Sequence, residues 1–249
     1  MKQPASKRRS LPLLPSTGPN VLLQYFAAMH RHFGDQHWWP AESPFEVMIG
    51  AVLTQNTSWR GVELAIARLR DASAIDAVVL YRLGPVEIAP LIRPAGYFNV
   101  KSRRLWNLAA WFVETHHADF SALSRLPTQI LRAQLLAIRG IGPETADSIL
   151  LYALGRGIFV VDAYTRRLLS RHHLLPPAAG YHQMQQFMTA ALPESVELYN
   201  EFHAQIVKTG KQYCRPSPRC DHCPLRRFLP QPAVADSGKP PPPPTRRSA

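Results

Sequence analysis

The stretch LLAIRGIGPETADSILLYALGRGIFVVDAYTRR, residues 135–167, decides the fold prediction. Apolar residues recur at helical spacing on both sides of a tight turn, at Leu131, Leu135 and Ile138 before it and at Ala146, Ile149, Leu150, Ala153 and Leu154 after it. This spacing predicts two amphipathic helices joined by Gly140-Ile141-Gly142-Pro143. A glycine-broken connection then leads to the apolar run 158–161 and to Asp162, which precedes another helical segment.

The turn between these helices has the composition of a phosphate-binding site. Gly140 and Gly142 allow positive φ and close approach of another backbone, and Pro143 stands where a helix needs no N–H. Unpaired N–H groups at a helix start carry partial positive charge and bind phosphate without reading a base sequence. A plain glycine-capped corner would have the same residues. Asp162 downstream, in a chain of formal net charge +12, favours phosphate binding.

Asp162 has two compatible interpretations. An Asp directly before a helix is a common N-cap, because its carboxylate accepts hydrogen bonds from the first helical turn. A capping Asp is also held rigidly, as a catalytic carboxylate must be. On the helix that follows, Arg166 is expected to contact a phosphate.

The pattern L-x-x-I-x-G-I-G-x-x-T-A followed by V-V-D-A-Y-T-R-R resembles the signature of the endonuclease III-type DNA glycosylases of the HhH-GPD superfamily. The resemblance spans about residues 20–228. It is nearest to the branch that removes alkylated purines such as 3-methyladenine, through residues 38–40 (WWP), 53–59 (LTQNTSW) and Glu144. It implies that Gly140, Ile141 and Gly142 hold the DNA backbone and that Asp162 is required to cleave the bond between base and sugar.

One position departs from the bifunctional members of that family, which also cut the DNA strand. They carry a lysine two residues after the second hairpin glycine, where this chain has Glu144. A carboxylate cannot form the Schiff base that the amine forms with the sugar. The resemblance therefore implies a monofunctional glycosylase with water as nucleophile, in which Asp162 stabilises an oxocarbenium-like sugar or orients the water.

Gln55 and three aromatic residues are the candidates for contacts with bases. Gln55 matches the family position whose glutamine enters the space left by a flipped base, although a simple loop between helices is the alternative. Trp38 and Trp39 are expected either to stack on an extruded base or to seal the join between two lobes. Tyr97 is expected to line the base pocket or to pack.

Three cysteines, Cys214, Cys220 and Cys223, lie in the segment CRPSPRCDHCPLRRFL. Many family members hold a [4Fe–4S] cluster with the spacing C-x6-C-x2-C-x5-C. Here the first spacing is five and the fourth position is Leu229, so the set is incomplete unless a residue such as His222 contributes. A cluster with a non-cysteine fourth ligand, a zinc ion and a metal-free remnant stay open as alternatives. An odd number of cysteines without an export signal argues against disulfides.

Composition and pattern agree with a helical nucleic-acid-binding protein. The 29 Lys and Arg against 17 Asp and Glu favour an acidic partner, and 249 residues are enough for a sizeable core. Strand-like alternation is nearly absent, so the expected fold class is all-α. The resemblance implies two helical lobes with a DNA-binding cleft between them: residues 20–39 with 155–229, including the cysteine loop, and residues 40–154, a helical barrel ending in the helix-hairpin-helix. Residues 1–19 and 230–249 are expected to be a disordered basic arm and a disordered proline-rich tail.

The expected function is that of a base-excision-repair N-glycosylase that flips a damaged base, an alkylated purine, out of double-stranded DNA. We expect a monomer in the cytoplasm, associated with the nucleoid. The sequence has no run of about 18 apolar residues, so it predicts no membrane span. Two alternatives stay open. One is a bifunctional glycosylase and AP lyase for oxidised pyrimidines, with Lys208 or Lys211 replacing the missing lysine. The other is a non-catalytic helix-hairpin-helix DNA-binding protein.

Overall fold

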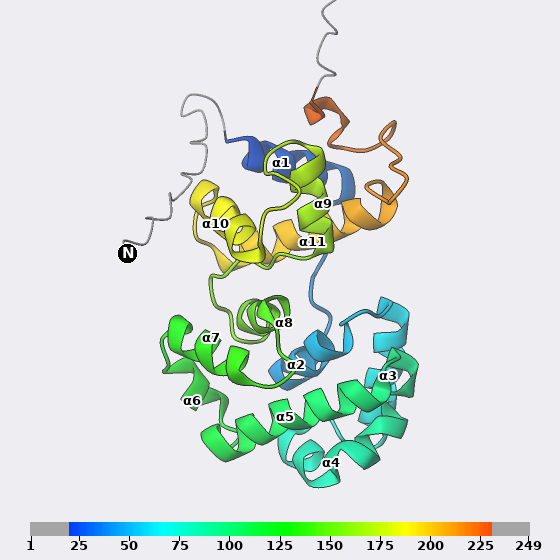
Figure 1. The fold of residues 1–249 in the computed structure, drawn as a ribbon, viewed down its shortest axis with the longest axis vertical. Coiled ribbons are helices and arrows are strands. Elements are labelled where there is room, and N and C mark those ends of the chain that lie inside the picture. Colours follow the sequence, from blue (N-terminus) through cyan, green and yellow to red (C-terminus); the bar gives the residue numbers. More distant parts are fainter. Residues whose placement is uncertain (1–19, 231–249) are drawn as a thin grey trace, which may run out of the picture.

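The computed structural model describes residues 20–230, and the regular elements in this range are all helices, with no strand (Figure 1). The helices are α1 (Val21–Phe33), α2 (Pro44–Leu53), α3 (Trp59–Asp71), α4 (Ala77–Leu91), α5 (Phe98–His116), α6 (Phe120–Ser124), α7 (Thr128–Ala137), α8 (Pro143–Ser148), α9 (Ala163–Arg171), α10 (Tyr181–Ala191) and α11 (Val196–Gln212). The shorter elements are η1 (Arg93–Ala95), the π-helical η2 (Ile149–Ala153) and η3 (Arg226–Phe228). The all-α prediction is confirmed. The expectations for residues 1–19 and 231–249 lie outside the described residues.

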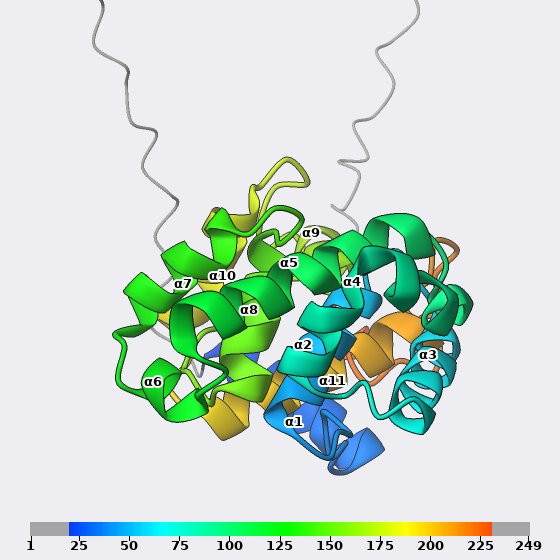
Figure 2. The same cartoon turned by 90° about the horizontal axis from the view of Figure 1, so that it is seen from below.

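Two hydrophobic cores organise the described chain. The first contains buried residues between Phe45 and Leu150, and the second joins residues of α1 to residues between Leu151 and Leu225. Figure 1 shows the corresponding groups of helices one above the other, with α1, α9, α10 and α11 in the upper group. Figure 2, seen from below, shows α5 running across the lower group, with α6 and α7 towards one end and α3 towards the other.

The second helix of the hairpin belongs to both cores. Ile149 and Leu150 are buried in the first core, and the next residue, Leu151, is buried in the second. The π-helical geometry of η2 follows directly on α8, and the N–H of Arg156 closes the segment by donating to the carbonyl of Leu150 at 2.8 Å. The hairpin is therefore anchored to both groups of helices.

The predicted hairpin forms between α7 and α8. Gly140 has φ of 99°, and a Cβ at this position would clash with Cγ of Arg104. Glycine is thus required there by conformation and by space. Gly142 differs from the expectation, because it has φ of −94° and is the extended N-cap of α8. Pro143 is the first residue of α8, as predicted.

Caps begin several of the predicted helices. The Ser43 hydroxyl accepts the N–H of Glu46 at 3.2 Å at the start of α2, and the Asn20 side chain accepts the N–H of Leu22 at 3.0 Å at the start of α1. Each cap satisfies an N–H that the helix leaves unpaired. Among the described helices, none is both long and apolar enough to cross a membrane.

Candidate active site

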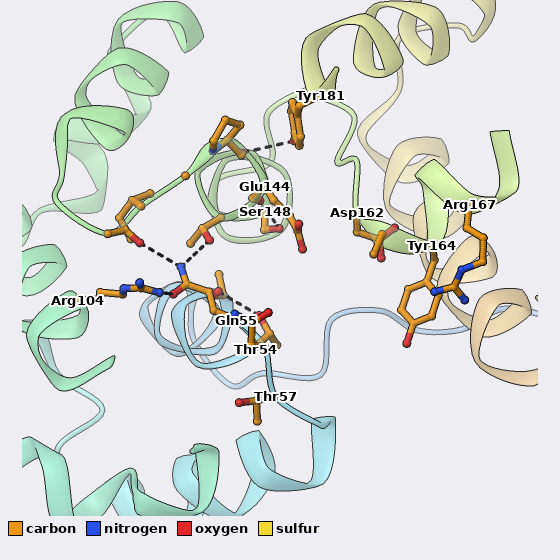
Figure 3. Close-up of a pocket in the computed structure, with 18 residues that line it drawn as sticks. Thr54, Gln55, Thr57, Arg104, Glu144, Ser148, Asp162, Tyr164, Arg167 and Tyr181 are labelled. Carbon is orange, nitrogen blue, oxygen red and sulfur yellow. Dashed lines mark hydrogen bonds between the residues drawn. The ribbon is translucent and has the colours of Figure 1, made fainter. Parts of the chain in front are cut away.

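A cavity of about 920 Å³ opens beside the hairpin, between the two groups of helices (Figure 3). Its walls come from the loop after α2, from the hairpin and from the start of α9. The predicted site residues that line it are Gln55, Gly140, Ile141, Gly142, Glu144 and Asp162. The structure therefore brings together residues that are more than 100 positions apart in the chain.

Asp162 caps α9 and turns its other oxygen towards α11. Its Oδ1 accepts the N–H of Thr165 at 2.7 Å and the Thr165 hydroxyl at 3.0 Å. Its Oδ2 lies 3.6 Å from Nε2 of His203, and the Asp162 side chain is only 12% exposed. The cap interpretation is confirmed, and the cap fixes the carboxylate at the cavity wall.

The surroundings of Asp162 keep its carboxylate ionised. Burial by itself would raise the pKa of this carboxyl, but His203 and the two hydrogen bonds from Thr165 outweigh burial, so the pKa is lowered. A carboxylate that stays negative in a cavity wall largely shielded from water can stabilise positive charge that develops beside it.

Glu144 lies in the same cavity at the start of α8, and Figure 3 shows it between Ser148 and Asp162. Its pKa is raised, first by desolvation and then by the negative charge of Asp162. The cavity thus holds two carboxyl groups whose pKa values move in opposite directions. Glu144 offers no amine at this position.

The side chain of Gln55 is bound to the hairpin. Its Nε2 donates to the carbonyl of Gly140 at 3.2 Å and to Oγ1 of Thr145 at 2.9 Å, and Arg104 donates to its Oε1. The same Arg104 fills the space that a side chain at Gly140 would occupy. The expected intruding residue and the expected phosphate-binding turn are therefore one connected structure.

Trp38 and Trp39 do not line the cavity that holds Asp162. Their rings pack edge to face at 5.5 Å, and both contact Trp59, at 5.8 Å and 5.2 Å. We call these three residues the tryptophan cluster. Trp39 also contacts the ring of Tyr152 at 5.4 Å, and the Tyr152 hydroxyl lies 2.5 Å from Nδ1 of His203. The cluster is thus connected to Asp162 through Tyr152 and His203.

Tyr97 requires a correction, because it does not line the cavity. It precedes α5 in the left-handed region with φ of 46°, and it is 71% exposed. The turn before α5 directs it towards solvent instead of towards a pocket.

Arg167, and not Arg166, lines the cavity. Nη1 of Arg166 donates to the carbonyl of Ala179 at 2.7 Å, which ties it to the loop before α10. Arg167 lines the cavity beside Asp162 and Tyr164 (Figure 3), and its Nη1 donates to the carbonyl of Cys214 at 2.5 Å. Neighbouring residues on a helix point about 100° apart, which a sequence pattern for phosphate contacts does not resolve.

The three cysteines line a second cavity of about 290 Å³ together with His172 and Leu229. The loop that carries them is held against α9, because Arg171 donates to the carbonyls of Arg215 at 2.6 Å and Pro216 at 2.9 Å. Burial raises the pKa of the Cys223 thiol.

This cavity fits a cluster only in part. Three thiols that line one cavity suit three corners of a [4Fe–4S] cluster, since cysteine thiolates are its usual ligands. At the remaining side Leu229 offers no ligand, and Nδ1 of His172 is 2.9 Å from the hydroxyl of Tyr25. His222 does not line the cavity. The residues present do not supply a complete ligand set, and no step proposed below passes through a metal.

Two buried polar residues that contact residues of the cavity wall escape prediction from sequence. Asp147 accepts hydrogen bonds from Nε of Arg132 at 2.6 Å, from the Tyr181 hydroxyl at 2.7 Å and from Nε2 of Gln185 at 2.7 Å, which joins α7, α8 and α10. The other is His203, 5% exposed in α11. The sequence offers one sign of Asp147, a carboxylate directly after the core residue Ala146. The hydrogen-bond partners of Asp147 and the contacts of His203 come from distant segments.

Comparisons with known proteins identify the family. The HhH-GPD superfamily of base excision DNA repair proteins matches residues 49–194. A protein of Methanocaldococcus jannaschii with the provisional name of a DNA repair glycosylase is 45% identical over 209 residues, which cover 84% of this chain and 95% of that protein. Endonuclease III of Escherichia coli K12 is 25% identical over 182 residues, covering 73% and 81%.

Solved structures show the same fold. The H. pylori 3-methyladenine DNA glycosylase MagIII, bound to 1,N6-ethenoadenine, has a TM-score of 0.67 and 27% identity, covering 77% of this chain and 96% of that one. A trapped covalent endonuclease III–DNA intermediate has a TM-score of 0.73 and 21% identity, covering 86% and 96%.

The matched segment contains the hairpin, Glu144 and Asp162, which line one cavity. Its extent sets aside the interpretation as a protein that only binds DNA. The chain belongs to the HhH-GPD superfamily of base excision DNA repair proteins and is an endonuclease III-like DNA glycosylase.

Proposed function

We propose that this glycosylase is monofunctional, removes alkylated purines from double-stranded DNA and uses Asp162 with water as the nucleophile. The observation that carries the proposal is the pairing of a buried, ionised Asp162 with Glu144, which stands where a lyase would need an amine. The likeness to MagIII, a 3-methyladenine DNA glycosylase, supports the substrate class.

The hairpin would hold the DNA strand beside the cavity. The start of α8, where the first N–H groups have no partner within the helix, is open at Gly142, because an added Cβ there would meet nothing within 4 Å. Such groups bind a backbone phosphate without sequence preference. Arg167 at the cavity wall would add a positive charge for a neighbouring phosphate.

Cleavage would proceed with charge developing on the sugar. The C1′–N bond breaks, its electron pair leaves with the base, and a water oxygen bonds to C1′ while the water proton passes to solvent. Asp162 faces the cationic sugar with a fixed negative charge, which lowers the barrier electrostatically. A base that already carries a positive charge leaves as a neutral molecule, so little leaving-group activation is needed.

The tryptophan cluster is our proposed base-binding surface. Aromatic faces stack on an extruded base and attract a cationic one. Trp38 and Trp39 were candidates from the sequence, and Trp59 joins them by its ring contacts at 5.8 Å and 5.2 Å. The position of the cluster, connected to Asp162 through Tyr152, supports this assignment.

One observation favours the bifunctional alternative. Lys211 lies 5.9 Å from the centre of the Trp38 ring, and burial lowers its pKa. A lysine with a lowered pKa is a better Schiff-base nucleophile. Against this alternative, neither Lys208 nor Lys211 lines the cavity that holds Asp162.

Strand breakage distinguishes the two mechanisms. Methylated duplex DNA and a duplex with one oxidised pyrimidine are incubated with the protein, and strand breaks are counted before and after alkali. The proposal predicts breaks in the methylated duplex only after alkali, and no covalent adduct after borohydride treatment. Breaks without alkali, together with a borohydride adduct that is absent from Lys211→Met, would establish the bifunctional alternative.

A further inference from the structure

His203 connects two groups from different parts of the chain. Its Nδ1 lies 2.5 Å from the hydroxyl of Tyr152 in η2, and its Nε2 lies 3.6 Å from Oδ2 of Asp162 at the start of α9. His203 is 5% exposed, and its Nε2 is buried without a hydrogen-bond partner in the structure. A buried ring nitrogen without a partner, aimed at a carboxylate, needs an explanation.

The protonation of Tyr152 bears on which ring nitrogen of His203 carries a proton. Burial raises the pKa of Tyr152 well above its usual value, so its hydroxyl stays protonated and can donate to Nδ1. In a neutral imidazole one nitrogen accepts and the other donates. With Tyr152 as the donor to Nδ1, the proton of the neutral ring lies on Nε2, which faces Asp162.

We propose that His203, oriented by Tyr152, is the positioning residue that holds the Asp162 carboxylate towards the sugar. The catalytic part of this inference rests on the proposed function. At 3.6 Å the contact is longer than a hydrogen bond and acts electrostatically in the free protein. Catalytic contacts of this kind often shorten when the substrate binds.

Other charged and titratable groups act on Asp162 from the elements packed around it. Glu144 from α8 acts on it with negative charge, Lys211 from α11 acts with positive charge, and Tyr152 from η2 stays neutral. Thr165 holds Oδ1, which leaves Oδ2 to His203. His203 is the group that the structure places against this free oxygen.

The catalytic test compares single-turnover base release from methylated duplex DNA by the wild type, His203→Ala, His203→Gln and Tyr152→Phe. We expect His203→Ala to slow release by about 10-fold or more and to move the acid limb of the pH profile to higher pH, with little change in binding of an abasic-site duplex. His203→Gln, whose amide can donate to Asp162, is expected to recover part of the rate. An acid limb that does not move in a folded His203→Ala would overturn the proposal.

A second test does not depend on activity. Nitrogen-15 NMR of the histidine side chains, with His203 assigned by its loss in His203→Gln, reports which ring nitrogen carries the proton. We expect protonated Nε2, and we expect Asp162→Asn to change the Nε2 resonance more than that of Nδ1. Protonated Nδ1 would overturn the proposal. If the wild type released no base from any substrate, the proposed function would fail while this result still decided the role of His203.

Discussion

The amide of Gln55 and the hydroxyl of Thr145, 90 positions apart, are joined by a hydrogen bond of 2.9 Å. The bond ties the loop after α2 to the second helix of the hairpin, across the wall of the cavity. A glutamine that enters DNA must exchange this partner for a base. The loop that meets the base stack and the turn that meets the phosphate are therefore coupled.

Replacing Gln55 separates its two roles. We expect Gln55→Ala to lower the free energy of unfolding by about 1 kcal/mol, because hydrogen bonds to the hairpin are lost. We also expect the base-release rate to lose its dependence on the base opposite the lesion. Single-turnover assays with four opposite bases measure this. Thr145→Val is the matched control, since it removes the same bond and keeps the amide; equal opposite-base dependence in wild type and Gln55→Ala would refute the role of Gln55.

Glu144→Lys restores an amine at the start of α8. We expect this variant to give a covalent adduct with substrate DNA after borohydride treatment, and strand breaks without alkali, because a lysine there can reach the sugar carbon. Glu144→Gln has similar size and no amine, and should give neither. Failure of the lysine variant to form any adduct, while it still releases base, would mean that position 144 does not face the sugar.

Replacing Asp147 should lower the free energy of unfolding more than replacing an exposed Asp does. It is fully buried and bound by Arg132, Tyr181 and Gln185, so Asp147→Ala leaves the Arg132 guanidinium, which is 21% exposed, without its partner. We expect a loss of about 3–5 kcal/mol in the free energy of unfolding. Asp119→Ala, at the exposed N-cap of α6, should lose much less. Urea denaturation measures both, and losses of equal size would contradict the account.

Lys101 makes the free energy of unfolding depend on pH in the alkaline range. Its Nζ is buried and donates to the carbonyls of Leu53 and Ala95 at 2.8 Å each, and burial followed by the charge of Arg104 lowers its pKa to about 8. Between about pH 8 and the ordinary lysine pKa of 10.5, the unfolded chain binds more protons at this site than the folded one. The stability of the wild type relative to Lys101→Met should therefore rise with pH across this window.

Denaturation of both proteins at several pH values checks this expectation. The difference between the two free energies of unfolding isolates Lys101 from the other groups that titrate in the same range. A difference that stays constant, or that falls as the pH rises, would show that Lys101 is not desolvated in the folded protein.

Local patterns in the sequence predicted much of the fold. Helical spacing around Gly140 and the cap at Asp162 depend on residues within one or two turns, and the structure has both. The conformation of Gly142 was not predicted, because the extended N-cap conformation needs no glycine. The lack of a side chain at Gly142 leaves the start of α8 uncovered. Glycine at this position therefore opens the surface and is not required by the conformation of the turn.

The rest of the site depends on contacts between distant segments. His203 lies 41 positions after Asp162 and Tyr152 lies 10 before it, and no local spacing indicates that the three meet. Arg166 and Arg167 are equivalent as sequence, and only the packing of α9 against the loop before α10 selects Arg167 for the cavity. The incomplete cysteine set was visible in the sequence, whereas the placement of Leu229 beside the three thiols required the fold.

The most direct measurement of the central claim is single-turnover release of the free base from methylated duplex DNA, detected by mass spectrometry, for wild type and Asp162→Asn. Asn caps a helix as well as Asp does, so the variant should fold and bind an abasic-site duplex normally. The account predicts release of alkylated purine by the wild type and a loss on the order of 10³-fold in the variant. Release by Asp162→Asn at a rate near that of the wild type would contradict the assignment of Asp162 as the catalytic carboxylate.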